Sequence, residues 1–290
     1  MLGLGEQVVG VSHECDFPAD AKTKPIVSRP ALDFTQLNLA QIDSAIAQRI
    51  RNGESVYEID EGLLRELRPD LILTQDLCQV CAPSGSELTQ ALAALELKQQ
   101  IVWMSPHTIG EIEQNVRDLA AATGREREAE DWIASARARL VAIAARVPKA
   151  AAHPRVFCIE WPDPVFCCGH WVPEMIEIAG GFDALARKGA DSVRVAWDDV
   201  LRWDPEVIVF MPCGFHADKA IEQLPLLESR PNWKTLPAVV KNRVYVVDAD
   251  SYFARPGPRI IDGAELLAHL IHPELFDWHG PANAFVIPST

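Results

Sequence analysis

The sequence predicts an α/β fold with two lobes joined by one long α-helix. Short apolar runs alternate with stretches of helical periodicity along the whole chain, which is typical of α/β proteins. Residues 125–147 are rich in Ala, Glu and Arg and contain no Gly or Pro, so helix propensity is high throughout. This helix would be roughly 34 Å long, more than a crossover between two strands needs. The 290 residues suffice for two lobes with separate cores.

Seven apolar runs are expected to form strands, several of them directly after a turn signal such as Asp204-Pro205. These strands are 7–11, 25–28, 71–74, 101–104, 156–159, 207–211 and 244–247. The helical pattern places the shorter helices at 39–51, 61–67, 86–95, 108–123, 171–179, 217–227 and 263–271.

The domain boundaries follow from the long helix. A proline-bounded stretch at 148–154 interrupts the helical pattern, and a second α/β series begins at Arg155. We therefore expect an N-terminal lobe at 1–124, a connecting helix at 125–148 and a C-terminal lobe at 149–290. A single domain carrying one long surface helix is the alternative.

Composition narrows the classes of partner. The net charge is −14, from 41 acidic and 27 basic residues, which disfavours a nucleic acid or an anionic membrane as partner. No apolar run reaches the ~18 residues of a membrane span. The first 18 residues lack the features of a signal peptide, and the seven Cys are an odd number, so reduced thiols and a cytoplasmic location are expected for the sequence as written.

Aromatic, Cys, His and acidic residues follow five of the expected strands. Ligands of open α/β sheets bind beyond the carboxyl ends of the strands, so these residues are candidates for a ligand site. Aromatic walls with a few directed polar groups suit a large, flat, partly apolar ligand. The candidates are His13, Glu14, Cys15, Asp16, Gln75, Leu77, Cys78, Trp161, Phe166, His170, Cys213, Phe215, Tyr252, Phe253 and Arg255.

The cysteines allow a second interpretation. Cys78 and Cys81 have the spacing of a metal knuckle, and Cys15 and Cys213 would complete a four-thiolate site. Packing as small apolar residues is the interpretation that we favour for most of these sulfurs. A Cys15–His170 nucleophile pair is a third hypothesis, but the common hydrolase, metalloprotease and nucleotide-binding motifs do not occur, so we do not expect an enzyme.

Five segments resemble a known family. They are VVGVSHECDFP at 8–18, LRPDLILTQDLCQVCA at 67–82, EWPDP with GHWVPEM between 155 and 181, WDPEVIVFMPCGF at 203–215 and DADSYFARPGPR at 248–259. They are similar to the cobalamin-binding members of the helical-backbone class of ABC-transporter substrate-binding proteins. The resemblance implies two Rossmann-like lobes, a rigid backbone helix and a ligand cleft between the lobes. It also implies a monomer that binds cobalamin or a related corrinoid without catalysis, for ABC uptake or as an intracellular carrier.

The resemblance also implies roles for single residues. His13 would ligate the cobalt or line the cleft, with a turn contact to Glu14 or Asp16 as the alternative. Arg255 would bind a carboxamide or phosphate of the ligand, with a loop salt bridge as the alternative. An iron–siderophore or haem is the competing ligand. The acids expected to dock on permease subunits are Glu87, Asp198 and Asp199.

The family places a strand and a turn ahead of the GLG segment at residues 3–5. We therefore expect either a first lobe without that strand or a truncated start. In the second case the protein would be periplasmic or extracellular.

Overall fold

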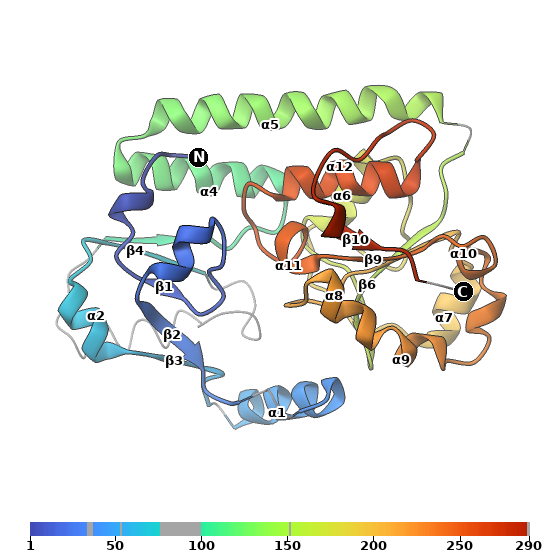
Figure 1. Ribbon diagram of the computed structural model, residues 1–290, viewed down its shortest axis with the longest axis horizontal. Helices are drawn as coiled ribbons and strands as arrows, with labels where there is room; N and C mark the ends of the chain where they lie inside the picture. The colour runs from blue at the N-terminus through green and yellow to red at the C-terminus, as the bar shows by residue number, and fades with distance from the viewer. Residues whose placement is uncertain (34–36, 53, 76–99, 151, 289–290) are drawn as a thin grey trace. The chain divides into compact units, whose positions relative to one another are not determined.

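The computed structural model describes residues 1–33, 37–52, 54–75, 100–150 and 152–288 (Figure 1). The chain divides into two compact units. Unit 1 comprises residues 1–106 and 113–130, and unit 2 comprises residues 107–112 and 131–290. The last of the three boundaries falls within helix α5 (Glu126–Arg146), between residues 130 and 131. The separation into lobes at 124 and 148, and the role of α5 as a rigid connection, stay predictions.

Unit 1 contains two small sheets among the described residues. Strand β1 (Val11–Ser12) is parallel to β2 (Ile26–Pro30), which pairs antiparallel with β3 (Tyr57–Ile59). Strands β4 (Leu71–Thr74) and β5 (Gln100–Trp103) form a parallel pair. The expected strand at 7–11 is largely wrong, because residues 5–7 form a 3₁₀ turn and Val8 and Val9 are exposed, so the apolar run buries little surface that would favour a strand.

Two helices of unit 1 begin and end as their sequences predict. Helix α1 (Leu39–Arg51) starts at a capping box, in which the side chain of Asn38 accepts from the N–H of Gln41. Helix α2 (Glu61–Leu67) starts at Asp60, whose carboxylate accepts from the N–H of Leu63. Helix α4 (Ile109–Thr123) follows β5. The helix expected at 86–95 lies outside the described residues.

Helix α5 matches the expected long helix to within one residue at each end. Its 21 residues correspond to a length of roughly 32 Å. Its buried positions recur every three or four residues and form one apolar stripe along the helix. They are Ala129, Ile133, Ala136, Leu140 and Ile143. None of the helices in the described part of the chain is both long and apolar enough to span a membrane.

Unit 2 is built on a five-stranded sheet in the order β10-β9-β8-β6-β7. Strands β6 (Val156–Pro162), β8 (Val207–Phe210) and β9 (Val244–Val247) are parallel. The edge strands β7 (Val165–Cys167) and β10 (Phe285–Val286) run antiparallel to their neighbours. The sequences of β8 and β9 are continuous apolar runs, because helices cover both faces of the sheet and bury every residue of these strands.

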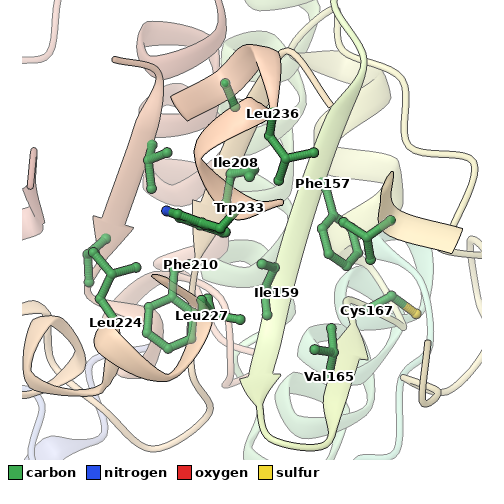
Figure 2. Close-up of a cluster of buried hydrophobic side chains, with 14 of the residues drawn as sticks. Phe157, Ile159, Val165, Cys167, Ile208, Phe210, Leu224, Leu227, Trp233 and Leu236 are labelled. Atoms are coloured by element: carbon green, nitrogen blue, oxygen red, sulfur yellow. The ribbon is translucent and has the colours of Figure 1, made fainter. Parts of the chain in front are cut away.

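Alternate residues of the parallel strands form the main core of unit 2 (Figure 2). Phe157, Ile208 and Val244 are neighbours across the sheet, and none is more than 8% exposed. Four short helices cover this face, whereas α6 (Val172–Ile178) and α12 (Ile260–Ile271) lie on the other face (Figure 1). The four are α7 (Trp197–Trp203), α8 (Ala217–Ala220), α9 (Pro225–Glu228) and α10 (Pro237–Val240). The α/β fold class is confirmed.

The remaining elements of unit 2 are short. Helix α11 (Ala249–Tyr252) follows β9 directly. The helix expected at 217–227 is wrong as one element, because a 3₁₀ turn separates α8 from α9. The 3₁₀ turns of the described chain are Gly5–Gln7, Ala19–Thr23, Val147–Lys149, Ile221–Gln223, Trp233–Thr235 and Ala282–Ala284.

Candidate functional site

The parallel strands of unit 2 end at one edge of the sheet, and the segments that follow them are hydrogen-bonded to one another. The N–H of Cys213, after β8, donates to the carbonyl of Glu160 in β6 at 3.2 Å. The N–H of Asp250, after β9, donates to the carbonyl of Phe215 at 3.3 Å. The three strand ends therefore bring their side chains together, as expected for the carboxyl edge of a parallel sheet.

Aromatic side chains lie at this edge. The rings of Trp161 and Phe215 meet edge to face, with centroids 6.2 Å apart, and both are half-buried. Phe166 is paired with Trp161 across β6 and β7, and the guanidinium of Arg194 lies 5.5 Å from the centroid of its ring. The indole Nε1 of Trp161 is buried and has no hydrogen-bond partner among the described residues. A buried donor without a partner is costly in a native structure, so a ligand that accepts from it would be stabilised.

A polar cluster lies beside the aromatic pair. The imidazole Nδ1 of His216 is 3.0 Å from the carboxylate of Asp248, which also accepts from the N–H of Ser251. The carboxylate of Asp250 is 2.5 Å from the guanidinium of Arg255 and 3.7 Å from Nε2 of His216. Both carboxylates are buried, at 7% and 5% exposed; the guanidinium of Arg255 compensates the charge of Asp250, and the imidazole of His216 contacts Asp248.

Three members of this polar cluster were missed in the sequence. His216 follows Phe215, Asp248 is the first residue after β9, and Asp250 follows two residues later. Like the candidates beside them, these residues follow an expected strand, so their position in the sequence could have identified them. Arg255 forms the loop salt bridge that the sequence offered as its alternative role.

Tyr252 and Phe253 lie in the core, which argues against the ligand contact expected for them. They are 7% and 3% exposed. The Tyr252 ring meets that of Trp278 edge to face at 6.0 Å, and Nε1 of Trp171 donates to the carbonyl of Phe253 at 3.0 Å. The physical reason is α11, which turns the chain inward immediately after β9. Burial, and then the charge of Asp248, raises the pKa of Tyr252.

His170 lies in a tight loop before α6. Its φ is +54°, in the left-handed region, and its ring centroid is 5.5 Å from that of His107. Burial lowers the pKa of His170, although the neighbouring carboxylate of Asp191 opposes this shift. A predominantly neutral imidazole is therefore present at neutral pH.

The described candidates in unit 1 directly follow strands β1 and β4. The imidazole Nε2 of His13 is 3.0 Å from the carboxylate of Glu14, so the turn contact offered as an alternative is present. Nδ1 of His13 is buried without a hydrogen-bond partner in the described structure. Cys15 is exposed, with its sulfur 3.3 Å from the hydroxyl of Ser12. Gln75 directly follows β4, and Asp16 is half-buried.

The five described cysteines are free thiols, and three of them are buried. Burial raises the pKa of Cys158 and Cys168 and raises that of Cys167 to about 11, so these thiols are protonated and unreactive. Cys213 is half-buried and Cys15 belongs to the other unit. Cys78 and Cys81 lie outside the described residues, so the four-thiolate site stays a prediction. Leu77 and Glu87 also lie outside the described residues.

The acids expected to dock on a permease lie in the first turn of α7. Asp198 is exposed, and Asp199 forms an ion pair with Arg202. Their docking role stays a prediction.

Comparisons with known proteins place this architecture in a family. Residues 1–251 match the family described as periplasmic binding protein. The chain is 26% identical over 284 residues to an uncharacterized ABC transporter substrate-binding lipoprotein, YvrC, of Bacillus subtilis, covering 95% of this chain and 76% of that protein. It is 26% identical over 267 residues to a vitamin B12-binding protein of Vibrio cholerae, covering 91% and 80%.

A solved structure of a periplasmic haem-binding protein from Pseudomonas aeruginosa has the same fold. The TM-score is 0.72 at 19% identity, with 100% of this chain and 92% of that chain covered. The chain therefore belongs to the periplasmic binding protein family, whose members are substrate-binding proteins and not enzymes.

Proposed function

We propose that the protein binds cobalamin or a related corrinoid and delivers it to the permease subunits of an ABC transporter. Similarity to the vitamin B12-binding protein of Vibrio cholerae over 91% of the chain supports this ligand. The Bacillus subtilis relative is named a lipoprotein of an ABC transporter. An uptake role would place this protein outside the cytoplasmic membrane, in contrast to the cytoplasmic location expected from its first residues.

The observation that carries the proposal is the aromatic pair Trp161–Phe215 beside a buried indole N–H without a partner. A corrinoid is a large, largely apolar ring system whose rim carries carboxamide groups. The two aromatic rings supply apolar surface for the ring system, and the indole N–H suits a carboxamide carbonyl. The carboxylates of Asp248 and Asp250, which lie beside the pair, are acceptors for carboxamide N–H groups.

The other candidates take supporting roles in this proposal. Phe166 belongs to strand β7, and His170 and Cys213 belong to loops of unit 2; all three would contact the ligand beside the aromatic pair. His13, Glu14, Cys15, Asp16 and Gln75 follow strands of unit 1, and we propose that they contribute the remaining contacts together with Leu77 and Cys78.

The competing ligands are haem and an iron–siderophore. The structural similarity to a haem-binding protein, at 19% identity, supports the fold alone. An anionic siderophore would need basic side chains, whereas the guanidinium of Arg255 is already paired with the carboxylate of Asp250. The edge of the sheet in unit 2 is lined by two buried carboxylates, which suits an amide-bearing ligand better than an anionic one.

The test compares two Phe-to-Ala variants. Phe215→Ala removes a ring from the candidate site, whereas Phe182→Ala removes an exposed ring beside the start of β6, at the opposite end of that strand. We expect wild type to bind cyanocobalamin at about 1:1 in equilibrium dialysis. Loss of the Phe215 ring should weaken binding by about 1–3 kcal/mol, roughly 5- to 150-fold, and Phe182→Ala should leave it unchanged.

Absorbance of the retained ligand separates the alternatives. Retention of haem but of no cobalamin form by wild type would refute the proposal. Equal affinities in the two variants would refute the assignment of the site.

A further inference from the structure

Three loops of unit 2 bring two imidazoles and a carboxylate together. His107 precedes α4, His170 precedes α6, and Asp191 belongs to the loop that leads to α7. The donor atoms of these three side chains all lie within 4.8 Å of one another. Nε2 of His170 is 3.3 Å from Oδ1 of Asp191, and Nε2 of His107 is 4.0 Å from the same oxygen.

These distances are close to those of a tetrahedral metal site. A Zn²⁺ ion with bonds of about 2.0–2.1 Å separates neighbouring ligand atoms by roughly 3.3 Å. The pair His170–Asp191 already has this separation, and His107 would have to move toward Asp191 by about 0.7 Å. The donor nitrogens of the two imidazoles lie within 4.8 Å of each other. The side chains of His107 and Asp191 are 40% and 74% exposed, so both are free to adjust and an ion can enter from solvent.

The backbone holds His170 in an unusual conformation at this position. Its N–H donates to the carbonyl of Ala190 at 2.6 Å, and its carbonyl accepts from the N–H of Gly189 at 2.9 Å. A β-carbon at the preceding Gly169 would lie 2.4 Å from the backbone nitrogen of Ser192, so only glycine allows this approach of the two loops. A non-glycine residue with positive φ is strained and persists where the surrounding structure requires it.

One ring nitrogen of His170 has no hydrogen-bond partner in the part of the chain that the structure describes. This nitrogen, Nε2, is buried and lies 3.3 Å from Oδ1 of Asp191. The carboxylate of Glu111 accepts from the N–H of His107 at 2.5 Å and adds a second negative charge 3.8 Å from its Nδ1. The cluster therefore combines an unsatisfied nitrogen donor with an excess of negative charge, both of which favour a cation.

We propose that His107, His170 and Asp191 form a binding site for a divalent transition-metal ion, with Zn²⁺ as the ion that this ligand set fits best. Two imidazole nitrogens and one carboxylate oxygen are borderline ligands suited to Zn²⁺, Co²⁺ and Ni²⁺ rather than to Ca²⁺ or Mg²⁺. Three protein ligands leave one coordination position for water or for a donor atom of a bound molecule. The proposal does not depend on corrinoid binding.

The test uses ZnCl₂ and CoCl₂ with full-length protein that has been stripped with a chelator and contains no corrinoid. Calorimetry should show one Zn²⁺ per chain with micromolar affinity or tighter. His107→Ala and Asp191→Ala change exposed side chains, so both variants should fold. Each should weaken binding by about 100-fold or more, because loss of even an outer-shell partner costs about 10–100-fold.

Two controls separate this site from adventitious binding. His279→Ala removes an imidazole from an exposed residue in the C-terminal segment and should leave the affinity unchanged. Cobalt absorbance distinguishes nitrogen and oxygen ligands, which give only d–d bands, from thiolates, which add charge-transfer bands. The proposal is overturned if Zn²⁺ binding is the same in wild type, His107→Ala and Asp191→Ala, or if the bound cobalt shows thiolate ligation.

Discussion

The structure predicts that one buried carboxylate, Asp183, makes the free energy of unfolding depend on pH. Replacing Asp183 by Asn should remove this dependence. Asp183 follows α6, and its two carboxylate oxygens accept from the N–H groups of Cys158 at 3.3 Å and Leu185 at 2.9 Å. Burial raises its pKa from 3.8 to about 6, although these backbone hydrogen bonds oppose the shift. Burial therefore favours the protonated form of this side chain more in the folded protein than in the unfolded chain.

The sign and size of the effect follow from linkage. The folded state holds its proton more tightly than the unfolded state, so Asp183 favours folding most below pH 3.8 and this contribution is lost as the pH rises through about 6. One pKa unit corresponds to 1.36 kcal/mol, so the full shift is worth about 3 kcal/mol. Between about pH 4 and pH 7 the expected change is about 2–3 kcal/mol, because part of the titration lies below pH 4.

Urea unfolding of wild type and Asp183→Asn at several pH values measures this contribution. Asn does not titrate. Subtracting the free energy of unfolding of the variant from that of wild type therefore cancels the contribution of the other carboxylates. The difference should fall by about 2–3 kcal/mol from pH 4 to pH 7. Asp218→Asn, at an exposed position, is the control and should give a nearly flat difference. A flat or rising difference for Asp183→Asn would show that the carboxylate is not destabilised by burial.

Two further predictions concern packing. Tyr252→Ala should lower the free energy of unfolding by about 3–5 kcal/mol while changing cobalamin affinity little, because the ring is buried against Trp278. Thermal unfolding and equilibrium dialysis measure the two quantities. Weaker cobalamin binding with unchanged stability would instead place Tyr252 at the ligand site. Gly263→Ala should cost about 1–3 kcal/mol, because a β-carbon would lie 2.4 Å from the carbonyl oxygen of Tyr252, whereas Gly257→Ala meets nothing within 4 Å and should be nearly neutral in urea unfolding.

Elements defined by their own residues were predictable from the sequence. Helices 39–51 and 61–67 and strands 71–74 and 244–247 have the expected bounds. Their signals are local, since a cap or an apolar period requires no knowledge of distant residues. The short strand β7 was missed because three residues carry little periodicity and form a strand only by pairing with β6.

The residues at the strand ends illustrate the limit for the candidate site. Position after a strand correctly indicated that Trp161 and Phe215 would be neighbours, because parallel strands of one sheet end at one edge. The same rule placed Tyr252 at the ligand site, yet α11 turns its ring into the core. The position of a residue directly after a strand predicts that it lies at the edge of the sheet. The direction of its side chain depends on how the next element packs.

The sequence by itself determined the fold class, the long helix and the edge of the sheet where polar and aromatic residues collect. These properties follow from composition and periodicity along one stretch of chain. Only the tertiary structure decided that His107, His170 and Asp191 meet and that His216 lies against Asp248. His107 and Asp191 are 84 residues apart in sequence. Their approach depends on backbone hydrogen bonds and glycine contacts between loops, and no local pattern encodes those contacts.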